Sequence, residues 1–230
     1  MFIYHRKSNI SVKEMVAFST MLFNPTLTLI VSIIFFFSSL VVLNVWPILF
    51  SLLWLWFVII FTRMGISHYL GEQYLTSPAE GKIYNINTVN IDGKEYIQIT
   101  IILRYHNIHS QHYPISGVIY SVEHRPGKFD FILDGSKGVN NEKIITAIES
   151  NAWDRVKVVQ IAGKIIRTIT NLSKPARRVT QGHLMGSIFM GSRVDVYFKK
   201  SLHAKILVAE GQKVNIGDIL AKKNKNQLQY

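Results

Sequence analysis

The sequence contains no cysteine, which excludes a thiolate nucleophile, and its candidate for nucleophilic chemistry is a serine that histidines could activate. Ser192 follows Gly191 directly, and the residues after it alternate apolar side chains with the period of a β-strand. Glycine permits backbone angles that other residues avoid, so the Ser192 hydroxyl can turn back onto the Gly191 carbonyl. Taken alone, a Gly-Ser pair before a strand is more often an ordinary turn, since both residues are common in turns.

A serine hydroxyl is a weak nucleophile and needs a base that a third group holds in place. Three histidines spaced three residues apart offer that base: His106, His109 and His112. Such a cluster could also bind a metal ion. No acidic or cysteine ligand accompanies it, and we predict no metal site.

The segment from Gly186 to Tyr197 resembles the self-cleavage segment of phosphatidylserine decarboxylases. The short forms of that family read close to G-x-I-x-F-G-S-R-V-D-V-Y, and the run that begins at Gly191 fits without a gap. The resemblance implies that Ser192 attacks the carbonyl of Gly191 and that the resulting ester eliminates. The serine remnant then becomes an N-terminal pyruvoyl cofactor on a small chain, residues 192–230, which stays associated with residues 1–191.

The histidine segment and one acidic turn resemble the same family. Residues 107–114 fit D-Y-H-x-x-H-x-P, which implies that His112 is the base for self-cleavage and that His109 assists decarboxylation. In shorter members of the family the equivalent of His109 is the one present, so this division of roles stays open. Residues 77–81 are similar to S-P-A-D-G, which implies that Glu80 orients the base.

Further matches keep the family's order from Ser77 to Ala221, among them P-G-K-F at residues 126–129 and Q-I-A-G at residues 160–163. The resemblance implies an enzyme that converts phosphatidylserine into phosphatidylethanolamine through a Schiff base to the pyruvoyl group. Arg167 and Arg193 are the candidate ligands for the lipid phosphodiester. The family's F-R-x-P-x-R element, which usually follows the membrane segment, is missing.

Charge and composition point to an anionic partner. Lysine and arginine number 26 against 14 acidic residues, a net charge of +12. Nucleic acid and an anionic lipid surface are the two candidates. The basic residues are scattered and form no run interleaved with aromatics, so we predict a lipid surface and no nucleic acid.

Two apolar windows, Thr26–Asn44 and Trp46–Thr62, are each close to the ~20 residues that cross a hydrocarbon core. They predict an α-helical membrane hairpin. Basic residues precede it and Arg63 follows it, which places both ends, and the catalytic domain, on the cytoplasmic side. The second window is short, so a monotopic or re-entrant pair is the alternative.

The predicted organisation is a membrane-anchoring hairpin at residues 1–64, a linker at 65–76, a catalytic β domain at 77–222 and a tail at 223–230. The predicted fold class is mainly β with few short helices. Segments at residues 77–81 and 210–220 resemble the halves of a lipoyl-like barrel-sandwich. Asp92-Gly93 predicts a hairpin turn, and the ranges expected as strands are 83–89, 96–103, 117–123, 129–133 and 156–161. Residues 142–150 are expected to form a short helix.

Two other functions remain open at this point. A membrane hairpin followed by a barrel-sandwich also describes the adaptor subunits of export pumps, although these usually add long coiled-coil heptads that are not visible here. A decarboxylase that no longer matures is the second alternative, because Glu80 and Asn107 both stand where the family has Asp. The oligomeric state is equally open, and a homodimer is one outcome.

Overall fold

The structure is a computed structural model that describes residues 2–3, 25–41, 45–63, 65–128, 130, 132, 138, 140–164, 169–188 and 192–223. The chain divides into two units. One comprises residues 5–64, and the other comprises residues 1–4 together with residues 65–230.

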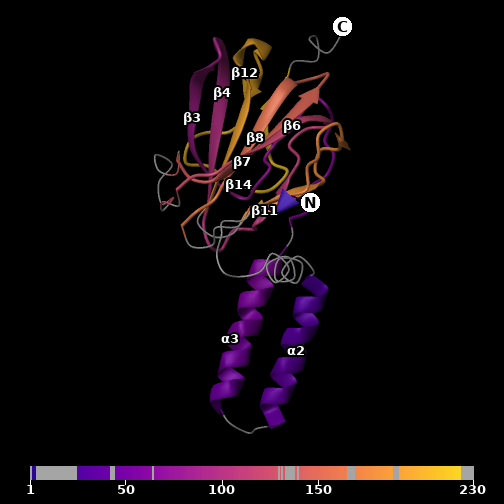
Figure 1. Cartoon of the computed structure of the whole chain (residues 1–230), viewed down its shortest axis with the longest axis vertical. Coiled ribbons are helices and arrows are strands. Elements are labelled where there is room, and N and C mark those ends of the chain that lie inside the picture. Colours follow the sequence, from indigo (N-terminus) through magenta and orange to yellow (C-terminus); the bar gives the residue numbers. More distant parts are fainter. Residues whose placement is uncertain are drawn as a thin grey trace. The chain divides into compact units, whose positions relative to one another are not determined.

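The smaller unit contains two helices, α2 (Pro25–Val41) and α3 (Val45–Thr62), which lie side by side (Figure 1). The Phe35 ring meets the Phe50 ring edge-on, with centroids 6.4 Å apart. The helices lie where the apolar windows predict them. Within the described part of the chain, however, no helix combines the length and apolar character that crossing a membrane requires. The predicted membrane hairpin is therefore not confirmed.

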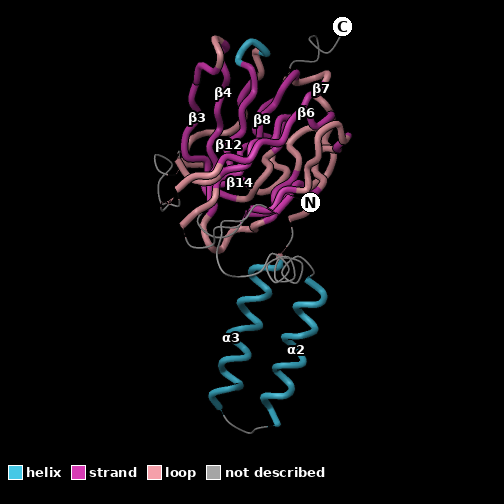
Figure 2. Tube along the Cα trace, in the orientation of Figure 1, coloured by secondary structure: helices cyan, strands magenta, loops and turns pink. Residues whose placement is uncertain are grey.

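The larger unit is mainly β, as predicted, and its strands are drawn in magenta in Figure 2. One short 3₁₀ helix, η1 (Lys200–Leu202), follows the strand that begins at Ser192. The strands are β1 (Phe2–Ile3), β2 (Tyr74–Thr76), β3 (Gly81–Ile91), β4 (Lys94–Leu103), β5 (Ser110–His112), β6 (Gly117–Arg125), β7 (Lys143–Ser150), β8 (Asp154–Ile161), β9 (Ile169–Asn171), β10 (Arg178–Val179), β11 (Leu184–Ile188), β12 (Ser192–Lys199), β13 (Lys205–Ile206), β14 (Lys213–Val214) and β15 (Ile219–Lys222).

These strands form three antiparallel sheets. The largest has the order β10-β6-β7-β8-β12-β4-β3-β14, and the smaller two have the orders β1-β9-β11-β5 and β13-β15-β2. Buried apolar side chains from all three sheets form one core, including Leu75, Ile101, Met185 and Val196. In the strand order of the largest sheet, β12 lies in the middle, with β4 on one side and β8 on the other.

The turn between β3 and β4 is the predicted hairpin. Asp92 and Gly93 both have positive φ angles, 52° and 76°. A two-residue hairpin turn of the primed type needs such angles, which explains the Asp-Gly pair. Pairing then continues from Ile91 opposite Lys94 to the far end of β4.

The short helix predicted for residues 142–150 is wrong, because these residues form β7. Strand β7 is paired on both sides, with β6 and with β8. Ile144, Thr146 and Ile148 are fully buried on one face, and their β-branched side chains suit a pleated surface. The strand expected at residues 129–133 falls largely outside the described residues.

Candidate active site

Ser192 begins β12, and it lies opposite Leu103, the last residue of β4. Its side chain is fully buried, and among the described residues its hydroxyl has no hydrogen-bond partner. A buried hydroxyl without a partner normally destabilises a fold, so this position calls for a chemical explanation. Gly191, the other half of the predicted cut, lies outside the described residues.

The histidine segment connects the neighbourhood of Ser192 with the end of β11. It leaves β4 one residue after Leu103 and enters β5 at Ser110, which lies opposite Ser187 of β11. Ile188 donates its backbone N–H to the carbonyl of His109 over 3.1 Å. Ile188, the last described residue of β11, is thus bonded to the histidine segment, and Ser192, the first residue of β12, lies opposite the residue at which β4 ends before that segment.

His112 lies in β5 with its ring held by the backbone. Its Nδ1 atom is 2.6 Å from the carbonyl oxygen of Gly182, and its Nε2 atom is buried without a partner among the described residues. A carbonyl oxygen can accept but not donate, so Nδ1 carries a proton, and in the neutral ring Nε2 keeps its lone pair. Burial lowers the pKa of His112, and His183 nearby acts in the same direction. This ring is thus a neutral imidazole able to accept a proton.

His109 is buried, and its backbone is fixed by a chain of amide side chains. The Gln111 amide donates to the carbonyl of His109 over 2.7 Å, and Gln160 donates to the side-chain oxygen of Gln111. Asn171 donates in turn to Gln160 and to Thr146. The sequence did not predict this hydrogen-bonded chain of Gln111, Gln160, Asn171 and Thr146. The one available signal was Gln160, a polar residue within an apolar run.

The Glu80 carboxylate accepts a hydrogen bond from the side-chain amide of Asn107 over 2.7 Å. The Asn107 side-chain oxygen accepts the backbone N–H of Arg104 over 2.8 Å. The two positions that depart from the family's aspartates are therefore direct partners. The predicted role of Glu80, which is to orient a histidine, remains a prediction.

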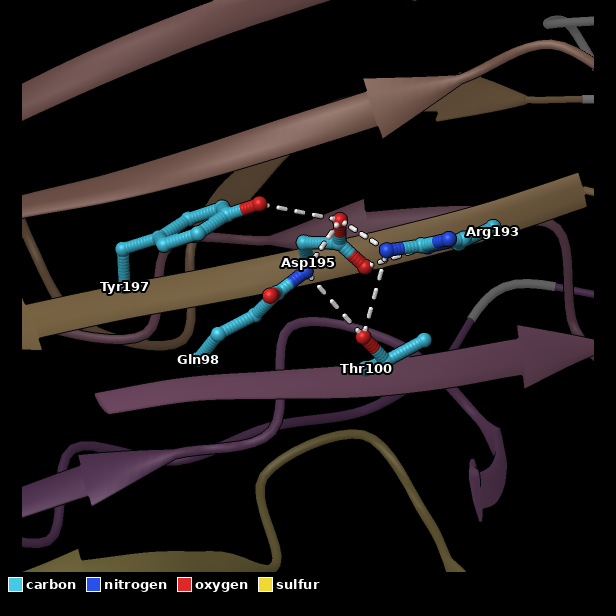
Figure 3. A network of polar contacts seen from close by, with 5 residues as sticks. All are labelled: Gln98, Thr100, Arg193, Asp195 and Tyr197. Atoms are coloured by element: carbon cyan, nitrogen blue, oxygen red, sulfur yellow. Dashed lines mark hydrogen bonds and ion pairs between the residues drawn. The ribbon is translucent and has the colours of Figure 1, made fainter. Parts of the chain in front are cut away.

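Arg193 is buried in an ion pair with Asp195 (Figure 3). The guanidinium makes two hydrogen bonds to the carboxylate, of 2.6 and 2.8 Å. Gln98 and Tyr197 also donate to the Asp195 carboxylate, and Arg193 reaches Thr100. Arg193 is thus engaged within the sheet, and its predicted contact with substrate remains a prediction. Arg167 lies outside the described residues.

No group of three or more metal-ligating side chains occurs among the residues that the structure describes. The candidate residues are a buried serine hydroxyl, a histidine whose pKa is lowered, and a second buried histidine whose backbone is held by hydrogen bonds. Its chemistry is that of proton transfer and nucleophilic attack.

Comparison with known proteins identifies the family of this chain. The family model described as phosphatidylserine decarboxylase matches residues 55–222. A phosphatidylserine decarboxylase proenzyme from Pelagibacter ubique (strain HTCC1062) is 33% identical over 159 residues, which cover 66% of this chain and 73% of that protein. Proteins of the same name from Ehrlichia canis (strain Jake) and Burkholderia mallei (strain SAVP1) are 37% and 32% identical. The matches cover 65% and 58% of this chain, and 67% and 62% of those proteins. The chain belongs to the phosphatidylserine decarboxylase family and is an enzyme of that type.

Proposed function

We propose that this enzyme converts phosphatidylserine into phosphatidylethanolamine with a pyruvoyl group that it makes from Ser192. The relatives named phosphatidylserine decarboxylase proenzyme support this reaction. The observation that carries the proposal is the buried hydroxyl of Ser192, which has no partner among the described residues and directly follows a glycine.

Self-cleavage begins with proton transfer from the Ser192 hydroxyl to the base, for which Nε2 of His112 has the required lone pair. The serine oxygen then bonds to the Gly191 carbonyl carbon, and the peptide C–N bond breaks to give an ester as the base returns its proton to the leaving nitrogen of residue 192. Loss of the Cα proton of residue 192 breaks the Cβ–Oγ bond and releases the Gly191 carboxylate. Water then replaces the nitrogen, which leaves as ammonia, and the pyruvoyl ketone remains.

The residues present fit a pyruvoyl group, because the Ser192 hydroxyl from which it would form is buried away from solvent. When present, the pyruvoyl ketone would supply an electrophile for a Schiff base with the headgroup amine and would accept electrons from the bond to the departing carboxylate. His109 is the proposed proton donor to the headgroup Cα after CO2 is lost. The amide chain that begins at Gln111 keeps the backbone of His109 in one place.

The test is to express wild type, Ser192→Ala and Ser187→Ala and to measure intact masses under denaturing conditions. Ser187 is the matched control, because it also follows a glycine and is buried, but its hydroxyl is bonded to Thr170. Wild type and Ser187→Ala should yield a chain that begins at residue 192 with a pyruvoyl mass, and should release CO2 from phosphatidylserine. Ser192→Ala should stay whole and inactive. A folded wild type that stays whole would favour the non-maturing alternative.

We also propose that residues 5–64 attach the enzyme to the bilayer from the cytoplasmic side. Large apolar side chains on α2 and α3 are strongly exposed, including Phe37 at 62% and Trp46 at 77%. Soluble proteins rarely expose so much apolar surface together. Basic residues before α2 and Arg63 after α3 suit a cytoplasmic membrane face.

Vesicle flotation tests this attachment. Wild type should float with vesicles that contain phosphatidylserine, whereas Ile34→Glu/Leu53→Glu should remain in the dense fraction. Leu207→Glu, at an exposed apolar position in the β unit, is the control and should float. The proposal is wrong if wild type stays behind with the unbound protein.

A further inference from the structure

Basic residues form a row across the largest sheet at the position of Arg193. Residues directly opposite one another on neighbouring strands place their side chains on the same face of a sheet. The row runs through seven neighbouring strands, each residue opposite the next, and five of its seven members are basic. From the β14 edge it reads Lys213, Lys82, Ile102, Arg193, Ile161, Lys143 and Arg125 on β6.

Two of the five basic members of this row have carboxylate partners, and the two nearest the β14 edge have no ion pair among the described residues. Arg193 pairs with Asp195, and Arg125 pairs with Glu123. Lys82 and Lys213 lie directly opposite each other, and among the described residues neither makes an ion pair. Like charges in that arrangement repel each other. An anion between them would reverse the sign of the interaction.

A cavity of about 420 Å³ opens at these two lysines. Arg104 adds a third cationic side chain to its lining, and Glu80 and Asn107 also line it. The cavity lies at the end of the sheet where β12 begins, because its Ile102 lies opposite Arg193, the residue after Ser192.

The net positive charge of the cavity lining complements the net negative charge of a phosphoserine headgroup. The lining combines three cationic side chains, Lys82, Arg104 and Lys213, with the single carboxylate of Glu80. A phosphoserine headgroup carries a phosphodiester, a carboxylate and an amine, so its net charge is negative. Lysine is a common ligand for phosphate, acting as a point charge.

We propose that this cavity binds the phosphodiester of the lipid headgroup through Lys82 and Lys213, with Arg104 as a further ligand. The inference rests on the proposed function. It assigns substrate binding to residues on β3, β14 and the end of β4, in place of Arg193, whose guanidinium is engaged by Asp195. The phosphodiester would then be held near the β14 edge, at the end of the sheet where β12 begins.

Binding can be tested without catalysis, in the uncleaved Ser192→Ala protein titrated with soluble glycerophosphoserine by calorimetry. Adding Lys82→Gln and Lys213→Gln should weaken binding about tenfold for each lysine, the change expected from losing one hydrogen bond to a charged group. Lys94→Gln/Lys205→Gln removes the same charge from exposed positions outside the cavity and should bind normally. Inorganic phosphate should compete with glycerophosphoserine in the Ser192→Ala protein.

Kinetics in the cleaving protein form the second arm. Self-cleavage needs no lipid, so Lys82→Gln/Lys213→Gln should mature at the wild-type rate while its KM rises for both micellar phosphatidylserine and glycerophosphoserine. A KM change confined to micelles would show that the lysines act on the anionic surface, and it would overturn the proposal. An absence of glycerophosphoserine binding to Ser192→Ala, or an equal loss in the control variant, would overturn it as well. A wild type that binds but neither matures nor decarboxylates would contradict the proposed function and leave the binding site standing.

Discussion

The hydrogen bond between His112 and the Gly182 carbonyl decides which ring nitrogen can act as a base. Since the carbonyl fixes the proton on Nδ1, the lone pair belongs to the buried Nε2. His109 has a different environment, because the amide chain fixes its backbone through its carbonyl oxygen. This difference supports separate roles for the two histidines.

Acid should therefore destabilise the folded protein through His112. Burial lowers the pKa of this residue below its ordinary value of 6.5, so below that pH the unfolded chain binds more protons than the folded one. Stability is then lost as pH falls from 6.5 towards the folded pKa, and it is unaffected above 6.5. Urea unfolding of Ser192→Ala should show this loss as the pH is lowered below 6.5, and His112→Gln should reduce it. An equal loss in both proteins would exclude His112 as its source.

The Glu80–Asn107 pair predicts a penalty for restoring the family's aspartate. In Asn107→Asp the donor to Glu80 becomes a second carboxylate, and two carboxylates at hydrogen-bond distance cannot both stay ionised. The variant should lose about 1–3 kcal/mol of stability at neutral pH. Glu80→Gln in the same protein should recover much of this loss, because an amide again faces a carboxylate. The check is a double-mutant cycle by urea unfolding, and additive losses would show that the pair is not coupled.

At the scale of elements, local patterns predicted what local physics controls. Alternating apolar residues and the Asp-Gly turn correctly indicated β3 and β4, because side-chain period and positive φ angles are properties of a few neighbouring residues. The same reasoning failed for β7, where pairing on both sides overrides the pattern read as a helix. The candidate roles of Gly191-Ser192 and the histidines were likewise predicted from a local motif, and they remain predictions. The Asp195 partner of Arg193 and the lysine pair of β3 and β14 depend on strand register between distant segments, which the sequence does not reveal.

Strand β12 should depend on its buried ion pair. Asp195→Ala leaves the Arg193 guanidinium buried without its carboxylate, and removing one member of such a pair costs about 3–5 kcal/mol. The double variant Arg193→Met/Asp195→Leu removes both charges and should be more stable than Asp195→Ala alone. Urea unfolding in the Ser192→Ala protein measures both. If the double variant is the less stable one, the ion pair has a role beyond compensating its own burial.

At the scale of the whole molecule, the proposed cut falls where the small chain is most thoroughly embedded. Residues 192–230 contribute β12 to the middle of the largest sheet, β14 to its edge beside β3, and β15 to the three-stranded sheet beside β2. Val194, Val196 and Phe198 are buried in the shared core. Loss of this chain would leave β4 and β8 unpaired on the side of β12, would remove the β14 and β15 partners of β3 and β2, and would expose that core.

We therefore expect the cleaved protein to remain a single particle. Size-exclusion chromatography in a neutral detergent buffer should give one peak that contains both chains, and dilution should not separate them, because β12 is hydrogen-bonded on both sides. The two chains should separate only when urea unfolds the sheet.

Phe198→Ala tests whether packing against β12 holds the chains together. The cavity that it leaves beside Trp153 should lower the urea concentration at which the chains separate. Leu207→Ala, at an exposed position, should leave that concentration unchanged. Release of residues 192–230 from a sheet that stays folded would show that pairing in β12 does not hold the two chains together.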